Sequence, residues 1–143
     1  MSIKFIKTPQ PIGNFVNVRY INNTAYISGQ GPFNDEGKLI IGKVGKDLNL
    51  EQAYDAARRV GISILSVIKN DIGLEKVSKV IKILGLVNCT EDFLQQPKVI
   101  NGCSDLLVEF FGEKGKHARS AVGVYVLPNN IPVEIEAIIE IKN

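Results

Sequence analysis

HARSAVGVYVLPNNIPVEIEAIIEIK, residues 117–142, holds the two runs of sequence that decide the fold. Residues 119–127 are rich in Val and small side chains and lie between turn formers, which is typical of a buried strand. Residues 133–141 alternate between apolar and mostly charged side chains, as a strand with one face on a core does. Pro-Asn-Asn at 128–130 separates the two runs. The pattern therefore predicts two strands joined as a hairpin-like pair.

Two charged side chains stand at the starts of these strands. Arg119 opens the first and Glu134 opens the second. A guanidinium can clamp a planar carboxylate, and a carboxylate can move protons, so the pair forms a minimal site for a small acidic substrate. A strand-end arginine is also commonly a solvated edge residue, and Glu alternating with Ile is also the wet face of a sheet. These residues alone leave both interpretations open.

Upstream, residues 15–20 and 24–28 predict a hairpin that turns at Asn22-Asn23. The second strand runs into SGQGP at 28–32, where two glycines and a proline end it as a turn. The glycine spacing fits neither a Walker nor a dinucleotide loop, so a phosphate cradle is excluded. Residues 38–44 are consistent with a further short strand.

Two helices are predicted between the strands. The first begins at Asn49, which resembles a capping box with Gln52, and it stops near Gly73. A strand dominated by Val, Ile and Leu follows over residues 77–87. The second helix covers residues 97–111 and starts with a proline.

This order of elements indicates a single α+β domain over residues 1–143, with a mixed sheet and both helices on one face. The opposite face of that sheet is then uncovered. Its apolar positions require another subunit to cover them, so we expect an oligomer.

Composition narrows the range of possible functions. The chain has 143 residues, is 45% hydrophobic and carries a formal net charge of +2. So balanced a charge favours neither nucleic acid nor a membrane surface as a partner. Cys89, Cys103 and the single histidine, His117, lack metal-ligand spacing, so no metal is expected and His117 is assigned to a loop. Without a recognisable signal peptide, we expect a cytoplasmic protein with both cysteines as free thiols.

Four motifs together resemble one family. TAYISGQGP at 24–32, GKVGKDLNLEQAYDAAR at 42–58, ARSAVGV at 118–124 and VEIEAIIEI at 133–141 are similar, in this order, to the Rid family. This is the YjgF-type group of reactive enamine/imine intermediate deaminases, older members of which carry an endoribonuclease label. The resemblance spans nearly the whole chain.

The resemblance implies a chorismate-mutase-like fold assembled as a homotrimer with clefts between subunits. It also implies hydrolysis of enamines and imines, such as 2-aminoacrylate and 2-iminopropanoate, to 2-oxo acids and ammonia without a cofactor. By position, Arg119 matches the arginine that holds the substrate carboxylate, and Glu134 matches the acid that positions water. Gly29 matches a backbone contact to the substrate. Within one chain, Arg119 and Glu134 are offset by more than ~10 Å along their strands. We therefore expect them to cooperate across a subunit boundary.

Three substrate-binding positions depart from the family pattern. Phe15 stands where a tyrosine is common, Ala121 replaces a frequent cysteine, and Ser104 falls near a frequent asparagine. These changes alter the cleft walls and leave the substrate open. A non-catalytic binding protein for small 2-oxo or imino acids is one alternative. A ribonuclease is another, although the basic stripe with stacking aromatics that it would need is not readable in the sequence.

Overall fold

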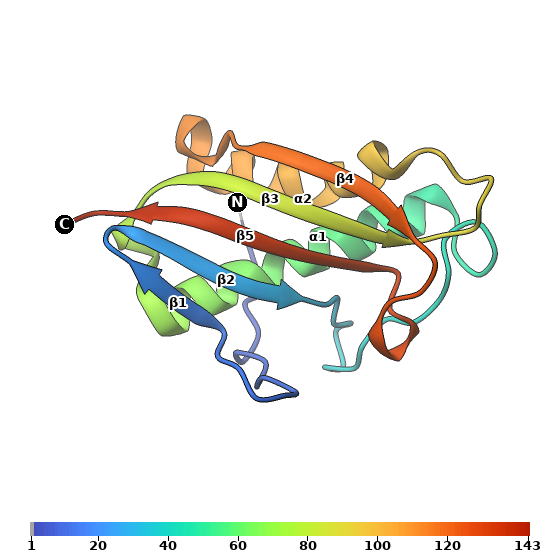
Figure 1. The fold of residues 1–143 in the computed structure, drawn as a ribbon, viewed down its shortest axis with the longest axis horizontal. Helices are drawn as coiled ribbons and strands as arrows, with labels where there is room; N and C mark the ends of the chain where they lie inside the picture. The colour runs from blue at the N-terminus through green and yellow to red at the C-terminus, as the bar shows by residue number, and fades with distance from the viewer. Residues whose placement is uncertain (1) are drawn as a thin grey trace.

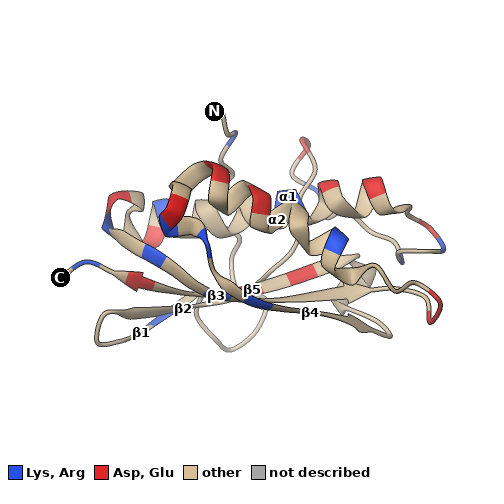
Figure 2. Ribbon diagram, turned by 90° about the horizontal axis from the view of Figure 1, so that it is seen from above, with Lys and Arg blue, Asp and Glu red and all other residues tan. Residues whose placement is uncertain are grey.

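The computed structural model describes residues 2–143 as one sheet with two helices on one of its faces (Figure 1 and Figure 2). The strands are β1 (Val18–Ile21), β2 (Thr24–Gln30), β3 (Val77–Asn88), β4 (Ala118–Val124) and β5 (Val133–Ile141). The main helices are α1 (Leu50–Val67) and α2 (Gln96–Phe111). In the sheet order β1-β2-β5-β3-β4, β3 and β4 run parallel and the other neighbouring pairs run antiparallel. The predicted α+β mixed sheet with both helices on one face is confirmed.

The predicted hairpin of residues 119–127 and 133–141 is wrong. β3 lies between β4 and β5, so that Ile83 pairs with Arg119 on one side and with Ala137 on the other. β4 is also an edge strand rather than a buried one, and it ends at Val124. The physical reason is that α2 carries the chain over the sheet and returns it parallel to β3.

The first helix begins as predicted. The Asn49 side chain accepts a hydrogen bond from the Gln52 backbone N–H at 2.8 Å, and the Gln52 side chain accepts from the Asn49 N–H at 2.9 Å. This reciprocal pair is a capping box. A π-helical turn, Ile68–Ile72, continues α1, and the chain leaves the helix at Gly73 with φ of 111°. The predicted stop at Gly73 is thus confirmed.

α1 and α2 pack closely because α2 carries a glycine at their contact. A Cβ atom on Gly102 would lie 2.1 Å from the backbone oxygen of Tyr54 and 3.0 Å from the backbone nitrogen of Arg58. Any larger side chain would push the helices apart. This close packing fixes α2 over β3 and β4, which places the side chains at the start of β4. No helix within residues 2–143 combines the length and apolarity needed to cross a bilayer.

The face of the sheet away from the helices carries apolar side chains. Tyr26 and Val122 are 47% and 43% exposed there, and Leu84, Leu86 and Ile138 are partly exposed beside them. Figure 2 shows both helices on the other face. In the single chain, the sheet therefore has the uncovered apolar face that the sequence predicted.

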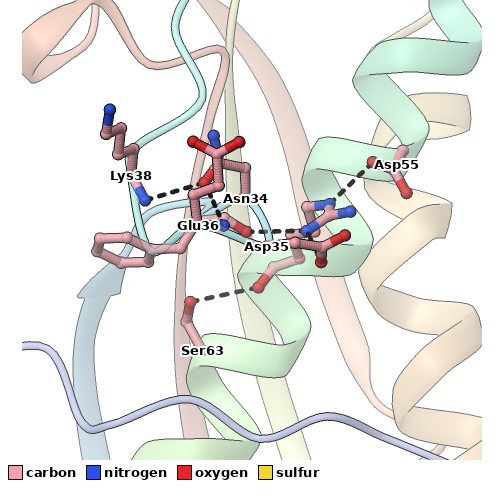
Figure 3. Close-up of polar contacts among 8 residues, drawn as sticks. Asn34, Asp35, Glu36, Lys38, Asp55 and Ser63 are labelled. Atoms are coloured by element: carbon pink, nitrogen blue, oxygen red, sulfur yellow. Dashed lines mark hydrogen bonds and ion pairs between the residues drawn. The ribbon is translucent and has the colours of Figure 1, made fainter.

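The loop after β2 is tied to α1 rather than forming a further strand (Figure 3). The Ser63 hydroxyl donates to the Gly31 carbonyl at 2.9 Å, and Arg59 pairs with Asp35 at 3.1 Å. Asn34 closes the turn by accepting from two backbone N–H groups, at 2.9 and 3.0 Å. These contacts hold the loop as one wall of the pocket described below.

The prediction of a short strand at residues 38–44 is wrong. Leu39 and Val44 form only isolated bridges. Gly42 and Gly45 have φ of 139° and 95°, and such values break the extended backbone that a strand requires.

Candidate functional site

The six residues predicted for the site fall into two groups at opposite faces of the sheet. The first group surrounds a pocket that we call the Glu134 pocket; it contains Phe15, Gly29 and Glu134. The second lies on β4 and the adjoining face of α2, which we call the Arg119 edge; it contains Ser104, Arg119 and Ala121. Neither group by itself holds both the proposed anchor and the proposed acid.

The Glu134 pocket has a volume of about 330 Å³. Three prolines and several branched apolar and aromatic side chains, Phe15 among them, make up most of its lining. Glu134 is the one ionisable residue among those that line it. A small ligand bound there would contact a mostly dry surface with one acidic group.

A β-bulge places Gly29 against the Glu134 side chain. Ile27 pairs with Ala137 whereas Gln30 pairs with Ile135, so three residue steps on β2 match two on β5. Gly29 thus lies within a bulged strand and not in the predicted turn. A Cβ atom on Gly29 would lie 2.6 Å from Oε2 of Glu134. The glycine therefore allows the carboxylate to lie directly on the backbone of β2.

The environment of Glu134 favours its protonated form. The side chain is half-buried, and this desolvation, followed by the nearby charge of Glu136, raises the pKa of the carboxyl group. No hydrogen bond or ion pair to this carboxylate is formed by any group in residues 2–143. An unpaired carboxyl group with a raised pKa is suited to accept a proton from water and return it.

At the Arg119 edge, the guanidinium is oriented by α2. Nη1 donates to the Ser104 hydroxyl at 3.0 Å, and Nη2 donates to the Pro97 carbonyl at 3.1 Å. Among the residues described, no carboxylate forms an ion pair with Arg119. Because a guanidinium has five N–H donors, three are left for a ligand. Arg119 is thus held in place without being neutralised, as a carboxylate anchor should be.

Ser104 also contacts the only histidine. Its hydroxyl oxygen lies 2.8 Å from Nε2 of His117, and Nδ1 of His117 lies 2.6 Å from the Gly115 carbonyl oxygen. His117 lies in a loop, as expected, but its side chain points back to α2. Sequence reasoning missed this contact because no local pattern pairs a helix residue with a loop residue 13 positions later.

The two groups cannot act on one small ligand within one chain. Arg119 pairs with Ile83 on one side of β3, and Glu134 pairs with Leu86 on the other. Two strand spacings and three residue steps separate their Cα atoms by roughly 14 Å. Arg119 faces the helices with Ile83, whereas Glu134 points to the opposite face. The distance between the Cα atoms of Arg119 and Glu134 is therefore larger than their offset along the strands alone.

The wall of the Glu134 pocket includes residues that the sequence did not single out. The segment preceding β1 supplies Pro9, Pro11 and Ile12. The Asn17 amide donates to the Pro9 carbonyl at 2.7 Å and ties this segment to the bulge, where the buried Gln30 amide donates to the Ser28 carbonyl at 3.0 Å. The sequence pattern put Gln30 in a turn after the strand, so it gave no signal of this arrangement.

Within residues 2–143, no three His, Cys, Asp or Glu side chains converge as metal ligands would. Burial raises the pKa of the Cys103 thiol, which lies near Arg119, to about 12. The guanidinium is therefore not neutralised by a thiolate.

Comparisons with known proteins indicate one family for this chain. Residues 3–140 match the family described as "YjgF/chorismate_mutase-like, putative endoribonuclease". Protein TCP17 of Trypanosoma cruzi is 36% identical over 100% of this chain and 91% of its own length. The 2-iminobutanoate/2-iminopropanoate deaminase of Dermatophagoides farinae is 31% identical over 94% of this chain and 91% of its own.

A solved structure agrees with the fold. The protein Atu1372 of Agrobacterium tumefaciens, whose function is unknown, superposes with a TM-score of 0.87 and 41% sequence identity, covering 93% of this chain and 86% of that one. The match to the family model spans nearly every element of the sheet and both helices. The chain therefore belongs to the YjgF/chorismate mutase-like family.

Proposed function

We propose that this protein hydrolyses the C=N bond of small 2-imino acids and of their enamine tautomers, giving a 2-oxo acid and ammonia. The active unit is a homotrimer in which the Arg119 edge of one subunit meets the Glu134 pocket of the next. One observation carries the proposal: an unneutralised arginine and an unpaired acid lie on opposite faces of one sheet. The relative from Dermatophagoides farinae that is named an iminobutanoate/iminopropanoate deaminase supports the reaction type.

Arg119 has the donors that substrate binding requires. The substrate carboxylate accepts hydrogen bonds from the guanidinium N–H groups that Ser104 and Pro97 leave free. This contact fixes the plane of the conjugated imine, whose carbon is already electrophilic. The protein then has to supply mainly orientation and proton transfer, and no cofactor is implied.

Glu134 performs the proton transfers. Its carboxylate accepts a proton from water as the water oxygen bonds to the imine carbon, and it passes this proton to the imine nitrogen, which gives a carbinolamine. The carbinolamine hydroxyl then loses its proton to Glu134, which delivers it to the amino nitrogen as the C–N bond breaks, so that ammonia leaves and the 2-oxo group forms. A raised pKa brings the carboxyl group closer to the working pH, where it both accepts and donates.

Binding without turnover is the second candidate, and one side chain favours it. Phe15 lines the Glu134 pocket with a ring that carries no hydroxyl group. If orientation of water needs that hydroxyl, the same two surfaces would bind a small 2-oxo or imino acid and release it unchanged.

Turnover of 2-iminopropanoate generated in place by an amino-acid oxidase tests the proposal. Arg119→Ala and Glu134→Ala should each lower kcat/KM by at least about 100-fold. The matched controls, Arg58→Ala and Glu109→Ala, remove a surface ion pair on the helices and should retain activity. Absence of turnover together with Arg119-dependent binding of pyruvate would favour the second candidate. Absence of both would refute the proposal.

Mixing subunits tests the shared site. If each site takes Arg119 from one chain and Glu134 from its neighbour, an equal mixture of the two alanine variants regains about one quarter of wild-type activity. The mixture is unfolded and refolded together so that the chains exchange. A mixture that stays inactive although native mass spectrometry shows oligomers containing both variants would refute the cross-subunit arrangement.

A further inference from the structure

Behind Arg119 lies a row of polar groups that the proposed reaction does not use. It runs from the guanidinium to the Ser104 hydroxyl, then to the His117 ring and to the Gly115 carbonyl. We propose that His117 is a positioning residue that acts on Arg119 through Ser104. The inference rests on the proposed role of Arg119 as the carboxylate anchor.

The partners determine the direction of each hydrogen bond. The Gly115 carbonyl can only accept, so the proton of the neutral imidazole lies on Nδ1, 2.6 Å away. Nε2 is then an acceptor. A guanidinium can only donate, so the Ser104 oxygen accepts from Arg119, and its own hydrogen is left for Nε2 of His117 at 2.8 Å. Every bond in the row therefore points from Arg119 towards Gly115.

Another helical serine shows what His117 changes. The Ser66 hydroxyl of α1 donates to the Ile62 backbone carbonyl, four residues earlier in its own helix, at 2.8 Å. This is the usual bond of a serine inside a helix. Ser104 of α2 donates instead to His117. The histidine therefore turns the hydroxyl away from its own helix and leaves an oxygen lone pair directed at Arg119.

A nucleophilic role for the Ser104–His117 pair is less consistent with the site. A serine nucleophile needs N–H donors beside it for the oxyanion that forms on attack. Ser104 lies in the interior of α2, where the backbone N–H groups are committed to the helix, and its oxygen already accepts from Arg119. The arrangement holds a cation in place and does not activate a hydroxyl.

The kinetic test uses three variants and separates KM from kcat. His117→Phe removes the acceptor and should raise KM for 2-iminopropanoate about 5- to 20-fold, with kcat changed less than about twofold, because a bond supporting a charged donor is lost. His117→Gln supplies an amide oxygen as acceptor and should restore most of the wild-type KM. Ser104→Ala should match His117→Phe. An unchanged KM in His117→Phe, or no difference between Phe and Gln, would overturn the inference.

A spectroscopic test needs no ligand. The chain has one histidine, so ¹⁵N-histidine labelling gives a single pair of ring signals. At alkaline pH the Nδ1–H tautomer should dominate, and Ser104→Ala should shift the Nε2 signal. A dominant Nε2–H tautomer would overturn the inference while leaving Arg119 as anchor. Failure of the wild type to bind pyruvate or turn over the imine would instead refute the proposed function, and the positioning role with it.

Discussion

Substituting Gly29 by alanine should impair the site through Glu134 while leaving the fold intact. The new methyl group would stand 2.6 Å from Oε2, 3.0 Å from Cδ and 3.1 Å from Cγ of Glu134. Real contacts of a Cβ atom stay above 3.0 Å and mostly above 3.4 Å, so the carboxylate oxygen must retreat by roughly 0.4 to 0.8 Å. The obstacle is the far end of a flexible, half-buried side chain, so the free energy of unfolding should change by less than about 1 kcal/mol.

Catalysis tolerates such a displacement poorly. A misplacement of about 1 Å can cost about 100-fold in rate, so we expect kcat to fall about 10- to 50-fold. The assay is steady-state deamination of 2-iminopropanoate, with urea unfolding measured on the same protein. The control places Gly29→Ala in a Glu134→Ala background, where no carboxylate remains to be displaced. There the substitution should cost less than about twofold. An equally large effect in both backgrounds would show that the glycine acts by some other route.

Three further predictions follow from packing and charge. Gly102→Ala should lower the free energy of unfolding by about 2–3 kcal/mol in urea titrations, because the methyl group meets α1 backbone atoms that cannot step aside. Glu134→Gln should be more stable than wild type at neutral pH, since the folded state disfavours the charged carboxylate. The advantage should vanish below the ordinary carboxyl pKa of 4.5 and grow as the pH rises through the higher folded-state pKa; a constant difference across this range would contradict the assignment. Cys103, whose pKa burial raises to about 12, should resist an aromatic disulfide reagent in the native protein and react once it is unfolded, as mass spectrometry of the labelled peptides can show.

Local patterns predicted the elements well where one face of an element is buried. The alternation over residues 133–141 correctly placed Glu134 on the face away from the helices. The Asn49 capping box and the stop at Gly73 were correct because caps depend on nearby residues. The order of the strands in the sheet, by contrast, cannot be derived from local sequence patterns. A tight turn at 128–130 is compatible with a hairpin and equally with a step over β3, and only the whole sheet decides between them.

The sequence named candidate site residues but did not show how one chain arranges them. The motifs indicated Arg119 and Glu134, whereas their opposite faces follow from the register: Arg119 pairs with Ile83 of β3 and Glu134 with Leu86, three residues further along. The bulge beside Gly29 also depends on the register between β2 and β5, which no single strand reveals. The contact of His117 with Ser104 arises from the packing of α2 on the sheet. In each instance the missing information was a distance between segments far apart in the chain.

The segment over the Glu134 pocket has a consequence for how this protein family can diversify. Its prolines reach the pocket from outside the sheet, and the Asn17 amide bonds it to the bulge. Arg119, by contrast, is fixed by the closely packed α2. Under the proposed role of Arg119, insertions and replacements in the leading segment would leave the carboxylate contact intact. Related chains would then recognise the same acid group and differ in the rest of the molecule that they accept.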